Sequence, residues 1–170
     1  MNARAVPKPS LRPYLPADLP LLAEIRLASI EELTVEDYDE AQRAAWASAA
    51  EDEAALAETL KKGLSLVALM EGSPVGFVVL LDGGLIDQLY VHPAVARSGV
   101  ASALLDAVEK LARARALPTL LVDASDTARP LFEKLGFTAE RRNTISLDGE
   151  WFGNTRMKKT LSPQTPDLRS

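Results

Sequence analysis

The sequence of 170 residues contains no cysteine and a single histidine, His92. The absence of cysteine excludes a thiol nucleophile, a thiolate metal site and a disulfide framework, and it favours a cytoplasmic location. One histidine cannot form a histidine-rich metal site, so we expect no bound metal. A serine-histidine-aspartate triad would have to use His92.

The chain also lacks an excess of positive charge and any long apolar run. Lysine and arginine number 19, and aspartate and glutamate number 24, which gives a formal net charge of −5. Nucleic-acid binding normally needs a clustered basic face, so we expect no nucleic-acid partner. No run approaches the ~20 apolar residues of a membrane span, and residues 1–16 lack the apolar stretch of a signal peptide. We therefore expect no membrane partner.

What is present predicts one α/β domain over residues 1–161, followed by a flexible, polar tail over 162–170. The first part favours a short strand and then three helices rich in alanine, glutamate and leucine. We expect the strand at 10–14 and the helices at about 18–30, 36–49 and 51–62.

The second part alternates strand-length apolar runs with turns and two helices. Three runs joined by two tight turns predict an antiparallel meander, and the strands on either side of the long amphipathic helix should be parallel. The order predicts a mixed, mostly antiparallel central sheet of about seven strands, flanked by helices. We expect strands at 64–70, 75–81, 85–91, 119–124, 137–147 and 151–161, and helices at 99–116 and 126–135.

The segment VHPAVARSGVASALL, residues 91–105, carries the clearest chemical signal. A strand leads through a short loop into the helix at Gly99. The first turn of a helix leaves N–H groups without partners and adds positive potential. The segment therefore predicts a main-chain cradle for phosphate or pyrophosphate, although an ordinary helix start is the alternative. The predicted cradle consists of Arg97, Ser98, Gly99, Val100, Ala101 and Ser102.

Together with the meander before it, this segment resembles the acetyl-CoA motif of the GCN5-related N-acetyltransferase (GNAT) family, whose members transfer an acetyl group from acetyl-CoA to an amine. The family pattern Gln/Arg-x-x-Gly-x-Gly/Ala falls on Ala96, Gly99 and Ala101, so its first position departs. A second block, residues 125–137, is similar to the family's Asn-x-x-Ala-x-x-Leu-Tyr-Glu-Lys-x-Gly-Phe.

The resemblance covers about residues 64–161, and two further stretches, 37–46 and 141–161, look like those of small bacterial acetyltransferases. It implies acetyl-CoA as cosubstrate, held where two parallel strands splay apart. The implied contacts are Leu89, Tyr90 and Val91 for pantetheine, residues 97–102 for pyrophosphate, Ser125 and Phe132 in the second block, and Arg129 and Lys134 near the adenosine.

Acyl transfer to an amine needs a base, a proton donor for the leaving thiolate and amides that stabilise the oxyanion. Asp87, in an apolar strand where a carboxylate would be partly desolvated, is the first candidate for the base; an ion-paired or backbone-bonded residue is the alternative. Tyr90 is either the acid or a packed aromatic, with Tyr38, Tyr14 or water as other donors. His92 is interpreted as a strand-end residue bonded to nearby backbone.

One position of the second block bears on the proton donor. Many members of the family have a tyrosine where this chain has Phe132, and that tyrosine is proposed to protonate the thioester sulfur. Phenylalanine cannot do so. We therefore keep open a non-catalytic acyl-CoA binding or sensing domain on the same fold, and an interaction module without any CoA role.

The first helices carry candidates for the acceptor side. An acidic cluster there would attract a cationic amine or form a solvated helix surface. Trp46 and Trp151 would line an acceptor cleft or be buried in the core or a dimer interface. Homodimers are common in the family, which leaves a homodimer open. We expect acetylation of a primary amine of a small molecule or peptide by direct attack in a ternary complex. The acidic cluster consists of Glu31, Glu32, Glu36, Asp37, Asp39 and Glu40.

Overall fold

A computed structural model describes residues 8–161, so the predicted tail at 162–170 lies outside the described residues. The strands are β1 (Ser10–Pro13), β2 (Leu64–Met70), β3 (Ser73–Leu80), β4 (Leu85–Val91), β5 (Thr119–Ser125), β6 (Thr138–Leu147) and β7 (Glu150–Thr160). Over the described range they form one seven-stranded sheet in the order β1-β2-β3-β4-β5-β7-β6. All neighbours are antiparallel except β4 and β5, which are parallel. The predicted mixed sheet is confirmed.

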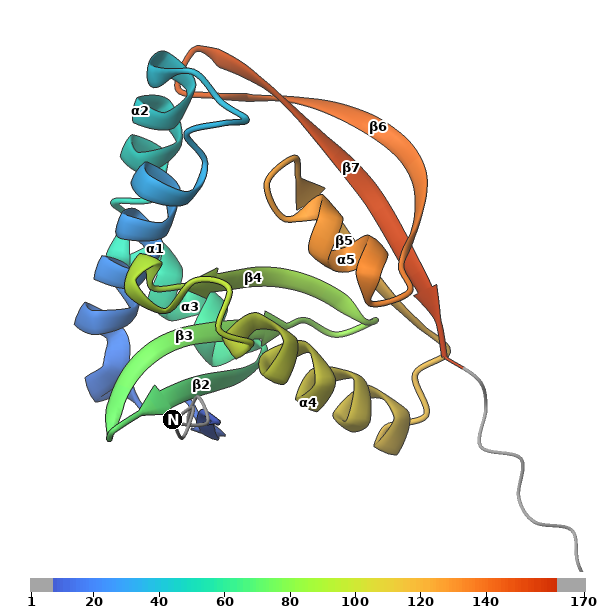
Figure 1. Cartoon of the computed structure of the whole chain (residues 1–170). Coiled ribbons are helices and arrows are strands. Elements are labelled where there is room, and N and C mark those ends of the chain that lie inside the picture. The colour runs from blue at the N-terminus through green and yellow to red at the C-terminus, as the bar shows by residue number, and fades with distance from the viewer. Residues whose placement is uncertain (1–7, 162–170) are drawn as a thin grey trace, which may run out of the picture.

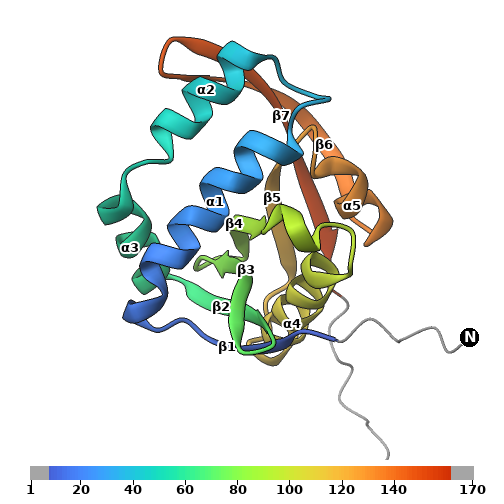
Figure 2. The same ribbon diagram turned by 60° about the vertical axis from the view of Figure 1, so that its left-hand side comes forward.

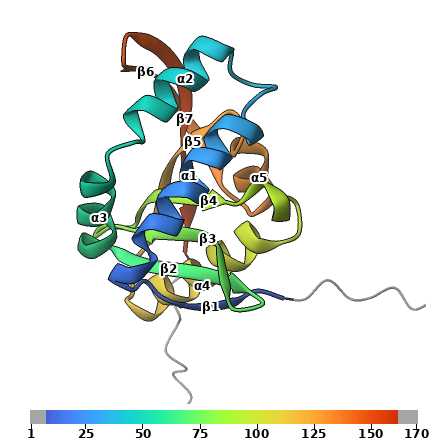
Figure 3. The same ribbon diagram turned by 90° about the vertical axis from the view of Figure 1, so that its left-hand side faces the viewer.

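Helices cover both faces of this sheet. They are α1 (Leu19–Leu33), α2 (Glu40–Ala49), α3 (Glu53–Lys62), α4 (Val100–Ala114) and α5 (Arg129–Lys134), with short 3-10 turns η1 (Pro16–Asp18) and η2 (Pro93–Val95). Figure 3 shows α3 on one side of the sheet and α4 and α5 on the other. Among residues 8–161, no helix is both long and apolar enough to cross a membrane.

The continuous apolar runs of β2 and β3 reflect burial on both faces. Val67 of β2 and Phe77 and Val79 of β3 pack toward α1 and α3, in one hydrophobic cluster. Ala68 of β2 and Val78 of β3 belong to the other cluster, which faces α4 and α5. Alternate side chains of a strand point to opposite faces, so a strand covered on both sides needs apolar residues throughout.

The second helix begins at Glu40, not at Glu36 as predicted, because a capping box fixes its start. The Gln42 amide donates to the Asp39 side chain over 2.7 Å, and the Asp39 amide donates to the Gln42 side-chain oxygen over 3.0 Å. These bonds satisfy donors that the helix itself leaves free. The preceding residues form a turn instead, in which the Tyr38 amide donates to the Thr34 carbonyl over 3.0 Å.

The parallel pair β4 and β5 separates soon after it forms. Within the described residues, the two strands pair at Leu85 with Leu121 and at Ile86 with Val122. Beyond that point the halves of the sheet spread apart toward α1 and α2 (Figure 1). The splayed strand pair that the family resemblance implies is therefore present.

A β-bulge lies at the start of the splay. Val79 of β3 faces Gln88, but its neighbour Leu80 faces Ile86, so Asp87 is an extra residue in β4. A bulge bends its strand, strengthens the local twist and leaves the extra residue outside the ladder. The bulge thus turns β4 away from β5. It places Asp87 at the fork, which is the point where β4 and β5 separate after the pair of Ile86 and Val122.

The open end of the fork is closed by helices and by the last hairpin. α1 and α2 run beside each other there, with β7 close to α2 (Figure 2). The Gln42 side-chain amide of α2 donates to the Trp151 carbonyl at the start of β7 over 2.8 Å. The fork is therefore bounded by segments that are far apart in the sequence.

Candidate active site

The loop between β4 and α4 is the segment in which the sequence predicts an anion cradle. Two of its residues have left-handed backbone conformations, Arg97 with φ 62° and Gly99 with φ 89°. Glycine adopts this conformation without strain, whereas arginine does so at some cost, which such sites often store. The α4 helix then starts at Val100, so its first-turn amides face the loop.

A pocket of about 430 Å³ lies in front of these amides. Gly99, Val100, Ala101 and Ser102 line one side of it. Two cationic residues also line it: Arg97 of the loop and Lys134 of α5. Helix amides and two positive charges around one space provide what an anion such as pyrophosphate needs.

Two of the predicted contacts are engaged within the protein, as is the departing position Ala96. The Ser98 amide donates to the Val95 carbonyl over 3.3 Å, and its hydroxyl donates to the same oxygen. Ser98 therefore holds the loop together, and its amide is not free for a ligand. Arg129 donates to Glu133 over 2.7 Å and to the Thr155 hydroxyl over 3.3 Å, so it belongs to a surface network instead of the pocket. Ala96 supplies its amide to the Pro93 carbonyl over 3.2 Å.

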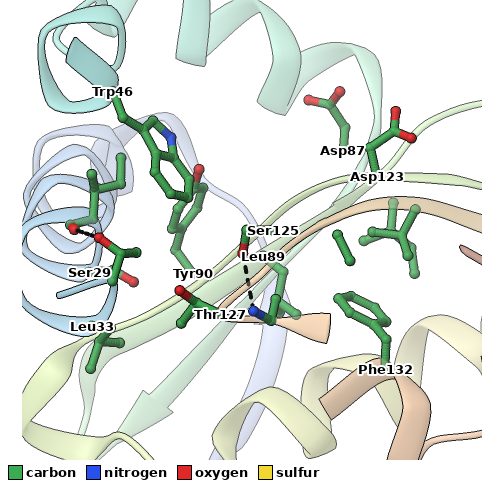
Figure 4. Close-up of a pocket in the computed structure, with 16 residues that line it drawn as sticks. Ser29, Leu33, Trp46, Asp87, Leu89, Tyr90, Asp123, Ser125, Thr127 and Phe132 are labelled. Carbon is green, nitrogen blue, oxygen red and sulfur yellow. Dashed lines mark hydrogen bonds between the residues drawn. The ribbon is translucent and has the colours of Figure 1, made fainter. Parts of the chain in front are cut away.

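A second pocket, of about 160 Å³, occupies the fork between β4 and β5. Figure 4 shows its side chains, which come from α1, α2, both strands and α5. Its polar residues include Ser29, Asp87, Asp123, Ser125 and Thr127, and its aromatic residues are Trp46, Tyr90 and Phe132. The predicted site residues Asp87, Leu89, Tyr90, Ser125 and Phe132 are thus brought together here.

Asp87 and Asp123 lie at the point where the strands part. Their preceding residues, Ile86 and Val122, form the last β4–β5 pair within residues 8–161, so the two aspartates occupy matching positions. Asp87 is exposed, contrary to the desolvation expected for it, and it accepts a hydrogen bond from the Gln88 side chain over 3.0 Å. Asp123 is held by Arg156 through bonds of 2.6 and 2.9 Å. Asp87 is therefore the less engaged of the two carboxylates.

Tyr90 is both packed and polar. Its ring lies 5.8 Å from that of Phe77 between centroids, as the packing interpretation expects. The Trp46 ring lies beside it in Figure 4 and lines the same pocket. Burial raises the pKa of Tyr90, while the charge of Arg26 and the indole of Trp46 oppose that rise. The Tyr90 O–H is thus kept protonated at neutral pH and faces the pocket.

Tyr38 and Tyr14, the other candidate donors, serve different ends. The Tyr38 hydroxyl accepts from the Asp126 amide over 2.9 Å and donates to the Gly153 carbonyl over 3.1 Å. Tyr38 is thus fully engaged in holding the fold. Tyr14 packs beside β1 against the α1 and α3 cluster and lines a pocket distant from the fork.

Phe132 and Ser125 have mainly structural contacts. Phe132 is 1 % exposed and packs edge-on against Phe137 with centroids 5.1 Å apart. The Ser125 hydroxyl accepts from the Ala128 amide over 3.1 Å and so shapes the turn before α5. Each still presents one edge to the fork pocket.

The remaining candidates have separate outcomes. His92 is exposed and its Nδ1 accepts from the Ala94 amide over 3.1 Å, as the strand-end interpretation expects. The six acidic-cluster residues are exposed and lie outside the lining of the fork pocket, although Asp37 accepts from Thr127 over 2.8 Å. Trp46 lines the pocket, whereas Trp151 is 67 % exposed on the last hairpin.

Several pocket residues escaped the sequence reasoning. Asp123, Ser29 and Thr127 line the fork, and Phe152 of β7 packs with Tyr38 and Trp46 in an aromatic group. One signal was readable: Asp123 is the acidic residue of an otherwise apolar strand, as Asp87 is. The others depend on contacts between distant segments.

Comparisons with known proteins agree with this geometry. The family described as "Acetyltransferase (GNAT) domain" matches residues 34–161. The chain is 36 % identical over 148 residues to an uncharacterized N-acetyltransferase of Escherichia coli K12, YafP, which covers 87 % of this chain and 93 % of that protein.

Solved structures are similar as well. The crystal structure of a GCN5-related N-acetyltransferase from Rhodopseudomonas palustris has 52 % identity and a TM-score of 0.88, with 91 % of this chain and 97 % of that chain covered. The paia N-acetyltransferase of Thermoplasma acidophilum, in complex with coenzyme A, has 17 % identity and a TM-score of 0.75, with 91 % and 100 % covered. At that identity the second likeness shows the fold alone.

Proposed function

This chain belongs to the GNAT acetyltransferase family, and we propose that it transfers an acetyl group from acetyl-CoA to a primary amine of a small molecule or peptide by direct attack in a ternary complex. One observation carries the proposal: β4 runs from the bulge at Asp87, past Tyr90, to the anion cradle at the start of α4. Side chains that could transfer protons and amides that could bind phosphate thus lie along one splayed strand and the loop that follows it.

The residues of the cradle fit acetyl-CoA. The amides of Val100, Ala101 and Ser102 would hold the pyrophosphate, with Arg97 and Lys134 adding charge. The part of β4 beyond the bulge, Leu89–Val91, lies outside the pairing with β5 and offers main-chain groups to the pantetheine. Acetyl-CoA would supply an activated carbonyl, so the cysteine-free chain needs no covalent intermediate of its own.

The proposed step uses Asp87 as base and Tyr90 as acid. The amine nitrogen forms a bond to the carbonyl carbon, and its surplus proton goes to the Asp87 carboxylate. The carbon–sulfur bond breaks, and the sulfur takes a proton from the Tyr90 hydroxyl. Asp87 then loses a proton to solvent and Tyr90 regains one, so both return to their initial states.

The assignment of the acid to Tyr90 follows from the hydroxyl groups around the fork. Phe132 has none, and the Tyr38 hydroxyl is used in two structural bonds. Tyr90 lines the fork pocket and its raised pKa keeps its hydroxyl protonated, so its proton is available to a leaving sulfur there.

The fork also favours a basic acceptor. Asp87 and Asp123 give the pocket negative charge, which attracts a cationic amine before it loses its proton. Trp46 supplies an apolar and polarisable wall on which the carbon chain of an amine can rest.

Binding tests the cradle first. We would measure the melting temperature with saturating acetyl-CoA, CoA and ATP, because a ligand of the folded state raises that temperature. Ser102→Glu adds an anion at the first turn of α4, where it stabilises the helix but repels pyrophosphate. Ala114→Glu adds the same charge at the other end of α4 and is the matched control. We expect a rise with acetyl-CoA that Ser102→Glu abolishes and Ala114→Glu retains.

Turnover is then measured as release of the CoA thiol with a panel of diamines, amino sugars, amino acids and peptides. Release that depends on an amine supports the proposal. Binding without release on any amine would instead support the acyl-CoA sensor, and a flat melting temperature at saturating acetyl-CoA would remove both readings.

A further inference from the structure

Arg26 is a buried cation beside the proposed active site. It is 8 % exposed and lies on α1, one turn before Ser29 and Ile30, which line the fork pocket. Residues at this spacing share one helix face. Burying a guanidinium is costly unless it has partners, so its retention here needs an explanation.

The contacts of Arg26 leave part of its charge free. One guanidinium nitrogen donates to the Ala50 carbonyl at the end of α2. The Nε lacks a hydrogen-bond partner among the described residues. Burial lowers the pKa of Arg26, and the two acidic groups that oppose this are Tyr90 and Asp52. Asp52 is exposed and caps α3, whereas Tyr90 is half-buried and lines the fork pocket.

Tyr90 is approached from several elements. Tyr90 and Trp46 pack against the cluster that contains Ala50, whose carbonyl accepts the Arg26 guanidinium, and Phe77 packs on the Tyr90 ring from β3. Asp87, on the same strand, is the one negative group acting on it within the described residues. The positive charge of Arg26 and the Trp46 indole thus both favour the ionised form of Tyr90.

We propose that Arg26 is a positioning residue that stabilises the negative charge formed on Tyr90 when the Tyr90 proton moves to the leaving sulfur. This inference rests on the proposed function. A half-buried tyrosinate without a countercharge would be disfavoured, and proton donation would then be slow. With Arg26 and Trp46 in place, the charge arises among groups already oriented to receive it, which is electrostatic preorganisation.

The test measures the ionisation of Tyr90 directly. The full chain, which has three tyrosines, is labelled with 3-fluorotyrosine, and the Tyr90 fluorine resonance is identified with Tyr90→Phe. Titration of this resonance compares the wild type with Arg26→Met, which removes the charge, and Arg26→Lys, which keeps it. Ile25→Val, a neighbouring buried change on α1, controls for loss of packing.

We expect Arg26→Met to move the Tyr90 titration to a pH about 1–3 higher, with Arg26→Lys close to wild type and Ile25→Val unchanged. The kcat of Arg26→Met should fall about tenfold or more while the KM for acetyl-CoA is retained, and Arg26→Lys should recover most of it. If Arg26→Met does not fold, Arg26→Gln replaces it, because glutamine also removes the charge but keeps an N–H donor for the Ala50 carbonyl.

The outcomes separate the two proposals. An unmoved Tyr90 titration, or a kcat for Arg26→Met equal to that of Ile25→Val, in an active enzyme would overturn the role of Arg26 alone. A wild type that turns over no amine would remove the proposed function and, with it, the role of Arg26. The fluorine titration needs no substrate, so it still reports whether the two side chains are electrostatically coupled.

Discussion

The main-chain amide of Asp126 donates to the Tyr38 hydroxyl over 2.9 Å, between residues 88 positions apart in the sequence. The same hydroxyl donates to the Gly153 carbonyl over 3.1 Å. One buried side chain in the α1–α2 loop thus joins the turn after β5 to β7, across the open end of the fork. Through these two long-range hydrogen bonds, the Tyr38 hydroxyl holds together three segments that lie around the fork.

Tyr38→Phe should therefore lower the free energy of unfolding by about 1–2 kcal/mol, since a partly buried amide and a partly buried carbonyl both lose a partner. The melting temperature should fall by roughly 2–4 °C for each kcal/mol. Urea unfolding of the variant, next to Tyr14→Phe as a hydroxyl deletion away from the fork, measures the difference. Equal stabilities of the two variants would contradict the structural role of Tyr38.

Local sequence patterns predict correctly those elements that are marked by apolar runs, by glycine or by capping residues. The strands at 64–70 and 85–91 have the predicted bounds; in the first of them, burial on both faces demands a nearly continuous apolar run. The start of α4 follows from a glycine that must adopt a left-handed conformation. The capping box of Asp39 and Gln42 was also readable and would have given the correct start of α2.

The features that could not be predicted depend on register and on distant contacts. The bulge that exposes Asp87 arises because β3 and β4 pair two residues against one, which no periodicity records. Asp123 reaches the pocket because β5 pairs with β4 in one register. Arg26 looks like an ordinary polar residue of an amphipathic helix, and the packing of α1 against β4 and of α2 against α1 is what buries it.

The free energy of unfolding should depend on pH through Asp18, in the 3-10 turn before α1. Arg12 donates to both Asp18 oxygens over 2.7 and 2.8 Å, and this holds the pKa of the Asp18 carboxyl below its ordinary 3.8. A lowered folded-state pKa stabilises the fold above the unfolded value, and the contribution is lost as pH falls below 3.8. Asp18→Asn should cost about 1–3 kcal/mol at pH 7 and progressively less toward acid.

Urea unfolding at neutral and acidic pH tests the Asp18 prediction. Asp106→Asn is the matched control, since Asp106 forms an exposed pair with Lys110 at 2.9 Å and should cost less than about 0.5 kcal/mol. A loss for Asp18→Asn that stays constant from pH 7 to pH 3 would show that the carboxylate charge is not what Arg12 stabilises.

Removal of the Arg97 charge should weaken cosubstrate binding without changing the chemical step. Arg97 lines the cradle pocket and lies away from the fork, so Arg97→Ala should raise the KM for acetyl-CoA by roughly tenfold at low salt and leave kcat nearly unchanged. The effect should shrink at high salt, where exposed charges are screened. Lys110→Ala, on the same side of the sheet in the exposed part of α4, is the control; equal KM values for both variants would refute the role of Arg97.

The roles of Asp87 and Asp123, which occupy matching positions on β4 and β5, can be distinguished by substituting each with asparagine. Asp87→Asn removes the proposed base and should lower kcat about 10²-fold or more. Asp123→Asn keeps an oxygen for Arg156 and should act mainly on the KM of a cationic amine. Steady-state kinetics with one diamine and one neutral amine distinguish them. A larger kcat loss in Asp123→Asn would transfer the role of base to β5.

Tyr90 and Phe132 provide the sharpest test of the acid. Tyr90→Phe should lower kcat about 10²-fold, because the sulfur then leaves without a positioned proton donor. Phe132 faces the same pocket from α5, so Phe132→Tyr places a second hydroxyl there, where related acetyltransferases commonly carry one. In the double variant, kcat should recover part of the loss, while Phe132→Tyr in the wild-type background should change kcat little.

This partial rescue discriminates a proton donor from a packing residue. Tyr90→Phe keeps the ring that packs on Phe77, so this packing is the same with or without the second substitution. A hydroxyl added at position 132 cannot repair such packing, but it can donate to the sulfur. Rescue of kcat at constant melting temperature would therefore identify the missing group as a proton donor. If Tyr90→Phe retained the full kcat, the proton would instead come from solvent.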